Sequence, residues 1–302
     1  MKKYEIANVR QRTNHTFLWM VYYALILSIF SGIVFAIDKN VNNGLLMAVL
    51  VTVGCAFVYL CNFKRWPFEL KNTDENRKKM TLPKFLIIIC LLFTCQLVSF
   101  LLMQLYTLSG LPEANISAES LQGDTTVFMV LYASLIGPIV EELMFRGFII
   151  GSTKQNGKII AIVLSAFIFG LMHANPLQFF AGFVSGLLLG YVFVEYSIVW
   201  TIILHIFNNF VLNELPLLLF KDASIDGTVD YIILGFAALL TVIAVIYLVK
   251  NKTISTFLKN PENHGEKGAV KKTLASAWLW VYIAFNIFNM VMVIFYSANK
   301  PI

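Results

Sequence analysis

The chain has 302 residues, of which 58% are hydrophobic and 13% are charged, and its mean hydropathy is +0.75. This composition excludes an ordinary soluble domain, because such domains carry about 25% charged residues. The formal net charge of +6 suggests a nucleic-acid partner when taken alone. The positions of the charges instead indicate a membrane protein, and no nucleic-acid binding is expected.

Long apolar runs recur along the chain and predict membrane-spanning helices. The basic residues 1–16 precede an apolar run of spanning length without a small-residue cleavage site, so we expect an anchor and not a cleaved signal peptide. Nine spans are predicted, at residues 17–37, 45–63, 84–108, 126–151, 158–175, 177–195, 198–218, 230–249 and 273–297. The expected fold is therefore an all-α polytopic transmembrane helical bundle of about eight or nine spans.

The charges between the predicted spans follow the positive-inside pattern. If the chain threads alternately, most Lys and Arg residues fall on one side, in residues 1–16, 64–83 and 250–272 and around Lys154 and Lys158. Most acidic residues between spans then fall on the other side. This pattern predicts a multi-pass protein of the cell membrane with its N-terminus in the cytoplasm and its C-terminus outside.

The four cysteines lie in or at the end of apolar segments, at Cys55, Cys61, Cys90 and Cys95. The chain has no CxxC motif and no Cys/His metal spacing. We therefore expect these cysteines to be packing residues, without disulfides or a cysteine-bound metal.

Three ionisable residues interrupt the fourth predicted span, in the stretch VEELMFRGF at residues 140–148. Charged groups at membrane depth are costly, and they mark functional sites by default. Glu142 and Arg146 are four residues apart, so they share a helix face and can pair. Glu141 is turned by about 100° from Glu142 and lacks such a partner, which leaves it available as a general base. The alternative is a buried charge cluster that only fixes helix register.

Two of the four histidines lie in the apolar spans that follow. His173 ends the stretch FGLMH, and His205 begins HIFNN, in which Asn209 falls on the same helix face. Glu141 could take a proton from water, while His173 orients that water or protonates the leaving amine. His205 and Asn209 present donors side by side, as the stabilisation of an oxyanion requires.

Other hydrolytic chemistries fit the sequence less well. No GxSxG elbow is present, so a Ser-His-Asp triad is not predicted. A zinc site built from two histidines and one glutamate is the metal-dependent alternative. However, there is no HExxH motif, and Arg146 would place a positive charge beside the cation. We therefore expect no metal and no other cofactor.

The stretches EELMFR, FGLMH and HIFNN fit the patterns EExxxR, FxxxH and HxxxN, in this order and on separate predicted helices. On these motifs, residues 126–215 resemble the CPBP family of CAAX proteases and bacteriocin-processing proteins, also called Abi proteins. The resemblance implies an intramembrane, glutamate-dependent endopeptidase that works without a metal. It also implies a CAAX-protease-like core with a cavity between the motif helices. The membrane spans in residues 1–125 and 216–302 are additions to this core.

The resemblance carries six catalytic-site residues over by position. Glu141 would activate the water together with His173, and His205 with Asn209 would stabilise the oxyanion. The remaining two, Glu142 and Arg146, would orient the site. By the predicted boundaries His173 lies toward the outer end of its span, so the spans must be tilted, or bounded differently, for the site to assemble.

The expected partners are the lipid bilayer and a membrane peptide or membrane-protein substrate. The topology and the lysine bias are typical of a bacterial protein, and bacteria generally lack CAAX prenylation. The family-level substrates are therefore peptide pheromones, bacteriocin precursors or other membrane proteins. A non-proteolytic scaffold or bacteriocin-immunity protein, which would keep the motifs as a structural cluster, is the main alternative. A proton-coupled transporter is less favoured, because the sequence shows no internal repeat.

Overall fold

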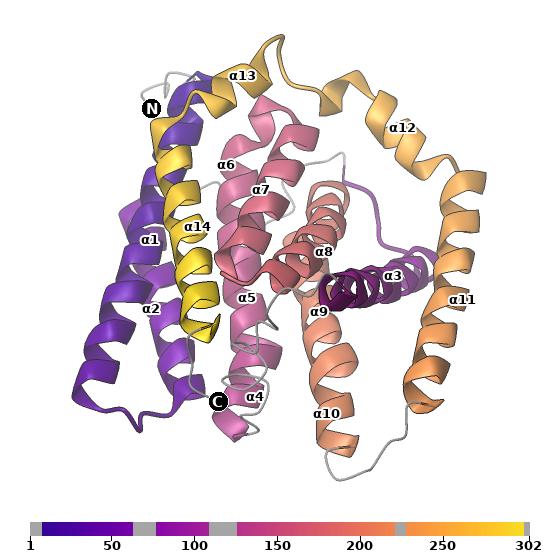
Figure 1. Ribbon diagram of the computed structural model, residues 1–302. Helices are drawn as coiled ribbons and strands as arrows, with labels where there is room; N and C mark the ends of the chain where they lie inside the picture. Colours follow the sequence, from indigo (N-terminus) through magenta and orange to yellow (C-terminus); the bar gives the residue numbers. More distant parts are fainter. Residues whose placement is uncertain (1–7, 63–76, 109–125, 221–227, 299–302) are drawn as a thin grey trace.

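The computed structural model describes residues 8–62, 77–108, 126–220 and 228–298 (Figure 1). Within these ranges most residues are helical and no strand is present, which confirms the predicted all-α fold. The elements η2, η3 and η5 are π-helical, and η4 and η6 are 3₁₀ turns. The elements are α1 (Val9–Ile37), α2 (Asn43–Asn62), α3 (Leu82–Leu108), α4 (Val127–Leu131), η2 (Tyr132–Ile136), α5 (Gly137–Glu141), η3 (Glu142–Ile150), α6 (Gly151–Thr153), η4 (Lys154–Asn156), α7 (Lys158–Met172), α8 (Pro176–Glu195), α9 (Ile198–Ile206), η5 (Phe207–Glu214), α10 (Leu215–Phe220), α11 (Thr228–Lys250), α12 (Thr253–Lys259), η6 (Pro261–Asn263), α13 (Ala269–Leu274) and α14 (Ala277–Ala298).

Every predicted span overlaps a helix, but the helices differ in length. Two of them, α7 and Ile198–Glu214, are apolar yet shorter than the other spans. The helices α11 and α12, bent by 50° at their junction, form one span if they are counted together. The described residues thus contain six or seven spans by length and composition, and the predicted count of eight or nine is not confirmed. The six long spans are Val9–Ile37, Asn43–Asn62, Leu82–Tyr106, Val127–Asn156, Pro176–Glu195 and Ala277–Phe295.

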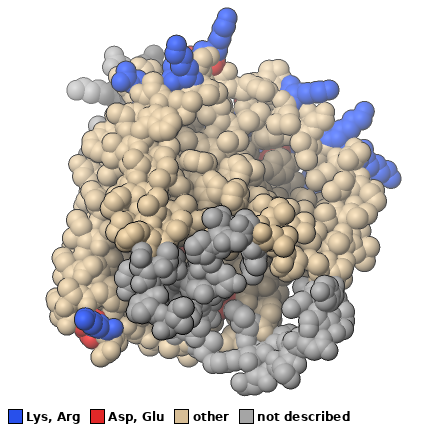
Figure 2. Space-filling model, viewed as in Figure 1, with Lys and Arg blue, Asp and Glu red and all other residues tan. Residues whose placement is uncertain are grey.

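If the chain crosses the membrane alternately, certain helix ends fall on the same side. Two pairs of such helix ends are in contact in the structure. Arg12 in α1 donates to Asn156 Oδ1 from Nε at 3.1 Å and from Nη2 at 2.9 Å. Lys78, just before α3, forms an ion pair with Glu195 at the end of α8. The helix α1 begins at the end of the bundle where α13 lies, and α14 runs from that end toward the other (Figure 1). Most Lys and Arg side chains in the space-filling view lie along the edge formed by the start of α1, by α13 and by α12, which we call the basic end (Figure 2).

Helices from both ends of the chain cover the back of the motif helix. Phe17 of α1 and Val51 of α2 belong to the same buried cluster as Met144 and Phe148 of η3. Tyr282 of α14 joins this cluster, with its ring centre 5.9 Å from that of Phe17. All four cysteines are free thiols in the structure. The flanking helices therefore shield the motif helix from lipid by continuous apolar packing.

Small residues hold α7 closely against α8. A Cβ added at Gly170 would lie 2.4 Å from the carbonyl oxygen of Phe179, and one added at Gly186 would lie 3.0 Å from Ala166 Cα. Small residues at such positions let two membrane helices approach each other. The turn predicted between the two helices is present, and Asn175 Oδ1 caps α8 by accepting hydrogen bonds from its first-turn N–H groups.

The shortness of α7 sets the depth of His173. The helix has 15 residues, which corresponds to a length of about 22 Å, less than the roughly 30 Å of a hydrocarbon core. His173 follows its last residue, and the turn to α8 lies about midway along the bundle (Figure 1). His173 therefore lies at the end of a short helix inside the bundle, beside the Phe169 ring.

We expect Gly170→Ala to lower the free energy of unfolding by about 1–3 kcal/mol, because the added methyl group requires a backbone shift between α7 and α8. Thermal unfolding in detergent micelles measures the effect. Gly235→Ala is the matched control, since no atom of the described residues lies within 4 Å of its added Cβ. Equal melting temperatures for the two variants would contradict the close α7–α8 contact.

Candidate active site

The helices that carry the first and third motifs widen around the candidate site. The π-helical segment η2 lies before the first motif, η3 contains Glu142 and Arg146, and η5 contains Asn209. Such turns are rare, and they occur often at functional sites. Their carbonyl groups accept hydrogen bonds from other helices: Phe145 O from Ser165 Oγ at 2.9 Å and Ala133 O from Asn209 Nδ2 at 3.0 Å. These bonds join neighbouring helices at the level of the site.

Glu142 and Arg146 form the ion pair that their spacing predicts. Arg146 Nη1 lies 2.9 Å from Glu142 Oε1, and both side chains are fully buried. The guanidinium carbon also lies 4.7 Å from the centre of the Phe169 ring, and Nη2 donates to Gly186 O at 3.4 Å. Buried charges are stable only when they are paired and hydrogen-bonded. Arg146 therefore ties η3 to both α7 and α8.

His205 lies between the two glutamates. Its Nδ1 is 2.7 Å from Glu142 Oε1, and its Nε2 is 3.6 Å from Glu141 Oε2. Because an ionised carboxylate can only accept, Nδ1 carries the proton that His205 donates to Glu142. The side chain of Glu141 is 17% exposed, whereas that of Glu142 is fully buried. Glu141 is thus the carboxylate that water can reach.

Phe169 sets the positions of both histidines. Its ring centre lies 5.1 Å from that of His173 and 5.7 Å from that of His205, edge-to-face in both cases. His173 Nδ1 lies 2.8 Å from Phe169 O, and since a carbonyl can only accept, the proton is on Nδ1. In the neutral form of this ring, the lone pair is on Nε2. Gly182 of α8 lies beside the ring, since a Cβ added there would be 3.5 Å from His173 Cε1.

Asn209 is the last of three polar side chains joined by hydrogen bonds. The sequence analysis did not predict this connection. Gln96 of α3 donates to Asn208 Oδ1 at 3.1 Å, and Asn208 Nδ2 donates to Asn209 Oδ1 at 3.1 Å. One Nδ2 hydrogen of Asn209 bonds Ala133 O, and the other has no acceptor among the described residues. The polar Gln96 inside the apolar span 84–108 is the sequence signal that could have revealed this chain.

The predicted site residues thus meet to different degrees. His205 lies beside both Glu141 and Glu142, and Arg146 pairs with Glu142. His173 is linked to this group through the ring of Phe169, which contacts both histidines. Asn209 contacts η2 rather than the carboxylates. An apolar cavity of about 340 Å³ lies beside this end of the site, between α3, η5 and α11. Its lining comprises Phe93, Gln96, Leu97, Phe100, Leu212, Leu234 and Ala237.

Comparison with known proteins adds one match. Residues 123–211 match the family model of type II CAAX prenyl endopeptidases, Rce1-like. The matched segment contains all six predicted site residues and spans under a third of the chain. No curated protein and no solved structure matches the chain. The match confirms the predicted resemblance to the CAAX protease family over this segment.

We expect Arg146→Ala to lower the free energy of unfolding by about 3–5 kcal/mol, because it leaves Glu142 as an unpaired buried charge. Protein abundance in membranes and thermal unfolding in detergent measure the loss. Lys272→Ala is the control, because it removes an ion pair with Glu266 that is exposed to solvent and should leave both readouts unchanged. Normal abundance and melting of Arg146→Ala would refute the stabilising role of the pair.

Proposed function

We propose, from the family match of residues 123–211, that the protein is an intramembrane endopeptidase in which Glu141 activates water without a metal. The observation that carries this proposal is the unequal placement of two adjacent glutamates. Glu142 is fully buried and bound to Arg146 and His205, whereas Glu141 is partly exposed and lies 3.6 Å from His205 Nε2. One carboxylate therefore orients the site, and the other remains free to exchange a proton with water.

The proposed reaction begins when the Glu141 carboxylate takes a proton from water. The resulting hydroxide oxygen bonds to the carbonyl carbon of the peptide and forms a tetrahedral intermediate. The C–N bond then breaks as the proton passes to the leaving nitrogen, which restores the Glu141 carboxylate. His173 supports the attack by water, because its Nε2 lone pair can accept a hydrogen bond from the attacking water and orient it.

The developing oxyanion needs hydrogen-bond donors that are already in place. Asn209 offers its remaining Nδ2 hydrogen, and His205 offers Nε2–H when the ring is doubly protonated. In that state the positive charges of His205 and Arg146 balance the two carboxylates. A preorganised donor of this kind contributes about 10²–10³ to the rate of acyl transfer.

The apolar cavity between α3, η5 and α11 supports a hydrophobic substrate. Gln96 lies in its wall and is joined through Asn208 to Asn209. A peptide whose apolar side chains occupy this cavity would therefore have its backbone near the proposed oxyanion donor. We propose a membrane peptide or a membrane protein as the substrate, held within the lipid bilayer.

A non-proteolytic scaffold is the second candidate function. The fully buried pair of Glu142 and Arg146 favours it, because such a pair stabilises and orients helices whether or not catalysis occurs. A scaffold requires only this pair, whereas the peptidase also requires the carboxylate of Glu141. The two functions are therefore separated by substitutions at Glu141.

We expect Glu141→Gln to lower cleavage of a quenched library of hydrophobic peptides by about 10²–10⁴-fold, since a general base is lost. Membrane abundance and melting should stay normal, because Glu141 is partly exposed and is not part of the buried pair. Glu214→Gln, a half-buried glutamate of η5 outside the site, is the control that should retain activity. Wild-type function in a cell carrying only Glu141→Gln would favour the scaffold instead.

Cleavage by the wild-type protein should persist after dialysis against a strong chelator. The proposed water is activated by a carboxylate, and the described residues hold no group of three His, Cys, Asp or Glu side chains placed for a metal. The measurement is the initial rate with and without chelator in proteoliposomes. Loss of activity that added Zn²⁺ restores would show that the reaction depends on a metal.

A further inference from the structure

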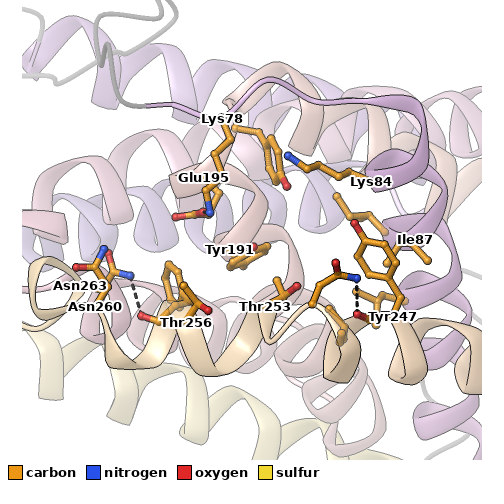
Figure 3. Close-up of a pocket in the computed structure, with 16 residues that line it drawn as sticks. Lys78, Lys84, Ile87, Tyr191, Glu195, Tyr247, Thr253, Thr256, Asn260 and Asn263 are labelled. Carbon is orange, nitrogen blue, oxygen red and sulfur yellow. Dashed lines mark hydrogen bonds and ion pairs between the residues drawn. The ribbon is translucent and has the colours of Figure 1, made fainter.

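A second cavity, of about 320 Å³, lies at the basic end of the bundle (Figure 3). Its walls come from α3, α8, α11, α12 and η6, and none of the six site residues contributes to it. Polar side chains face the cavity from several elements, but apolar atoms form the larger part of its surface, including side chains on the α3 side. The lining residues that matter here are Lys78, Lys84, Ile87, Leu91, Glu195 and Asn263.

The cavity carries one net positive charge. Its lining contains two lysines and one carboxylate, and Lys78 is paired with that carboxylate, Glu195. Lys84 is half-buried and lies over the ring of Tyr196, with Nζ 5.9 Å from the ring centre. No carboxylate in the described part of the chain pairs with Lys84. The cavity is therefore suited to an anionic group placed beside this ammonium.

A buried hydrogen-bond acceptor on the cavity wall indicates that a ligand with this anionic group also carries a hydrogen-bond donor. Asn263 is 2% exposed, and its Nδ2 donates to Phe257 O at 2.8 Å. Its Oδ1 has no hydrogen-bond donor among the described residues. A buried acceptor without a donor is costly, so a bound hydroxyl or amine at this position would be favourable.

Apolar helix faces adjoin the polar part of the cavity. Ile87 and Leu91 extend the wall along α3, from the polar rim toward the apolar part of the bundle. The short helix α12 forms another wall, and its exposed Ile254 and Leu258 are four residues apart on one face. Exposed apolar side chains on one face of a helix at this depth are typical of contact with the lipid interface.

We propose that this cavity binds the phosphate-bearing headgroup of a membrane glycerophospholipid. The phosphate lies against Lys84, a hydroxyl or amine of the headgroup donates to Asn263, and the acyl chains run along Ile87 and Leu91. Basic pockets between membrane helices are known to hold such headgroups. The volume is also within the range of small-molecule sites. The proposal stands apart from the glutamate site and from any peptidase activity.

The test measures binding of short-chain phosphatidylglycerol to the full-length protein in detergent micelles, by native mass spectrometry and by thermal stabilisation. Lys84→Glu should weaken binding at least about tenfold, as expected for the loss of a charged hydrogen bond. Lys84→Gln should weaken it less. Lys79→Glu is the matched control, because it makes the same change in charge at an exposed residue outside the cavity.

Two further ligands identify what is recognised. Diacylglycerol of the same chain length lacks the phosphate, and glycerol 3-phosphate lacks the chains, so each should bind at least about tenfold more weakly than the phospholipid. Equal binding of diacylglycerol would overturn recognition of the phosphate. Equal binding of glycerol 3-phosphate would overturn the membrane lipid as the source. Equal weakening by Lys84→Glu and Lys79→Glu would overturn the location.

Discussion

The buried ion pair between Glu142 and Arg146 is the constraint on which the arrangement of the site depends. Neither side chain reaches solvent, so their charges must be compensated within the protein. The compensation comes from four elements: η3 carries the pair, α7 supplies the Phe169 ring, α8 supplies Gly186 O and α9 supplies His205. The same contacts that neutralise the pair therefore fix where the proposed catalytic groups lie.

This constraint also explains features of the surrounding helices. The guanidinium reaches a carbonyl of α8 at a position where glycine allows α7 and α8 to lie close together. Because α7 is short, the chain turns within the bundle and places His173 at the level of Phe169 and His205. The helices α1, α2 and α14 pack behind the motif helix. These helices thus separate the motif helix from lipid, while the side chain of Glu141 stays partly exposed.

Local patterns in the sequence predicted the helical class, the i, i+4 pair and the turn at Asn175. These features depend on residues that are near one another in the chain, so spacing alone reveals them. The depth of His173 and the number of full spans depend on where a helix ends inside the bundle, which tertiary packing decides. The link from Gln96 to Asn208 joins helices more than 100 residues apart. The π-helical turns likewise depart from the 3.6-residue period on which the sequence reasoning relied.

The most direct test of the central claim is to follow the oxygen of the attacking water. A single turnover of a membrane peptide by the purified protein would be run in H₂¹⁸O, and the new C-terminal carboxylate would be analysed by mass spectrometry. If Glu141 activates water for direct attack, every first-turnover product carries one ¹⁸O atom. First-turnover product without ¹⁸O would contradict the account, because its oxygen would have come from an enzyme carboxylate acting as a nucleophile.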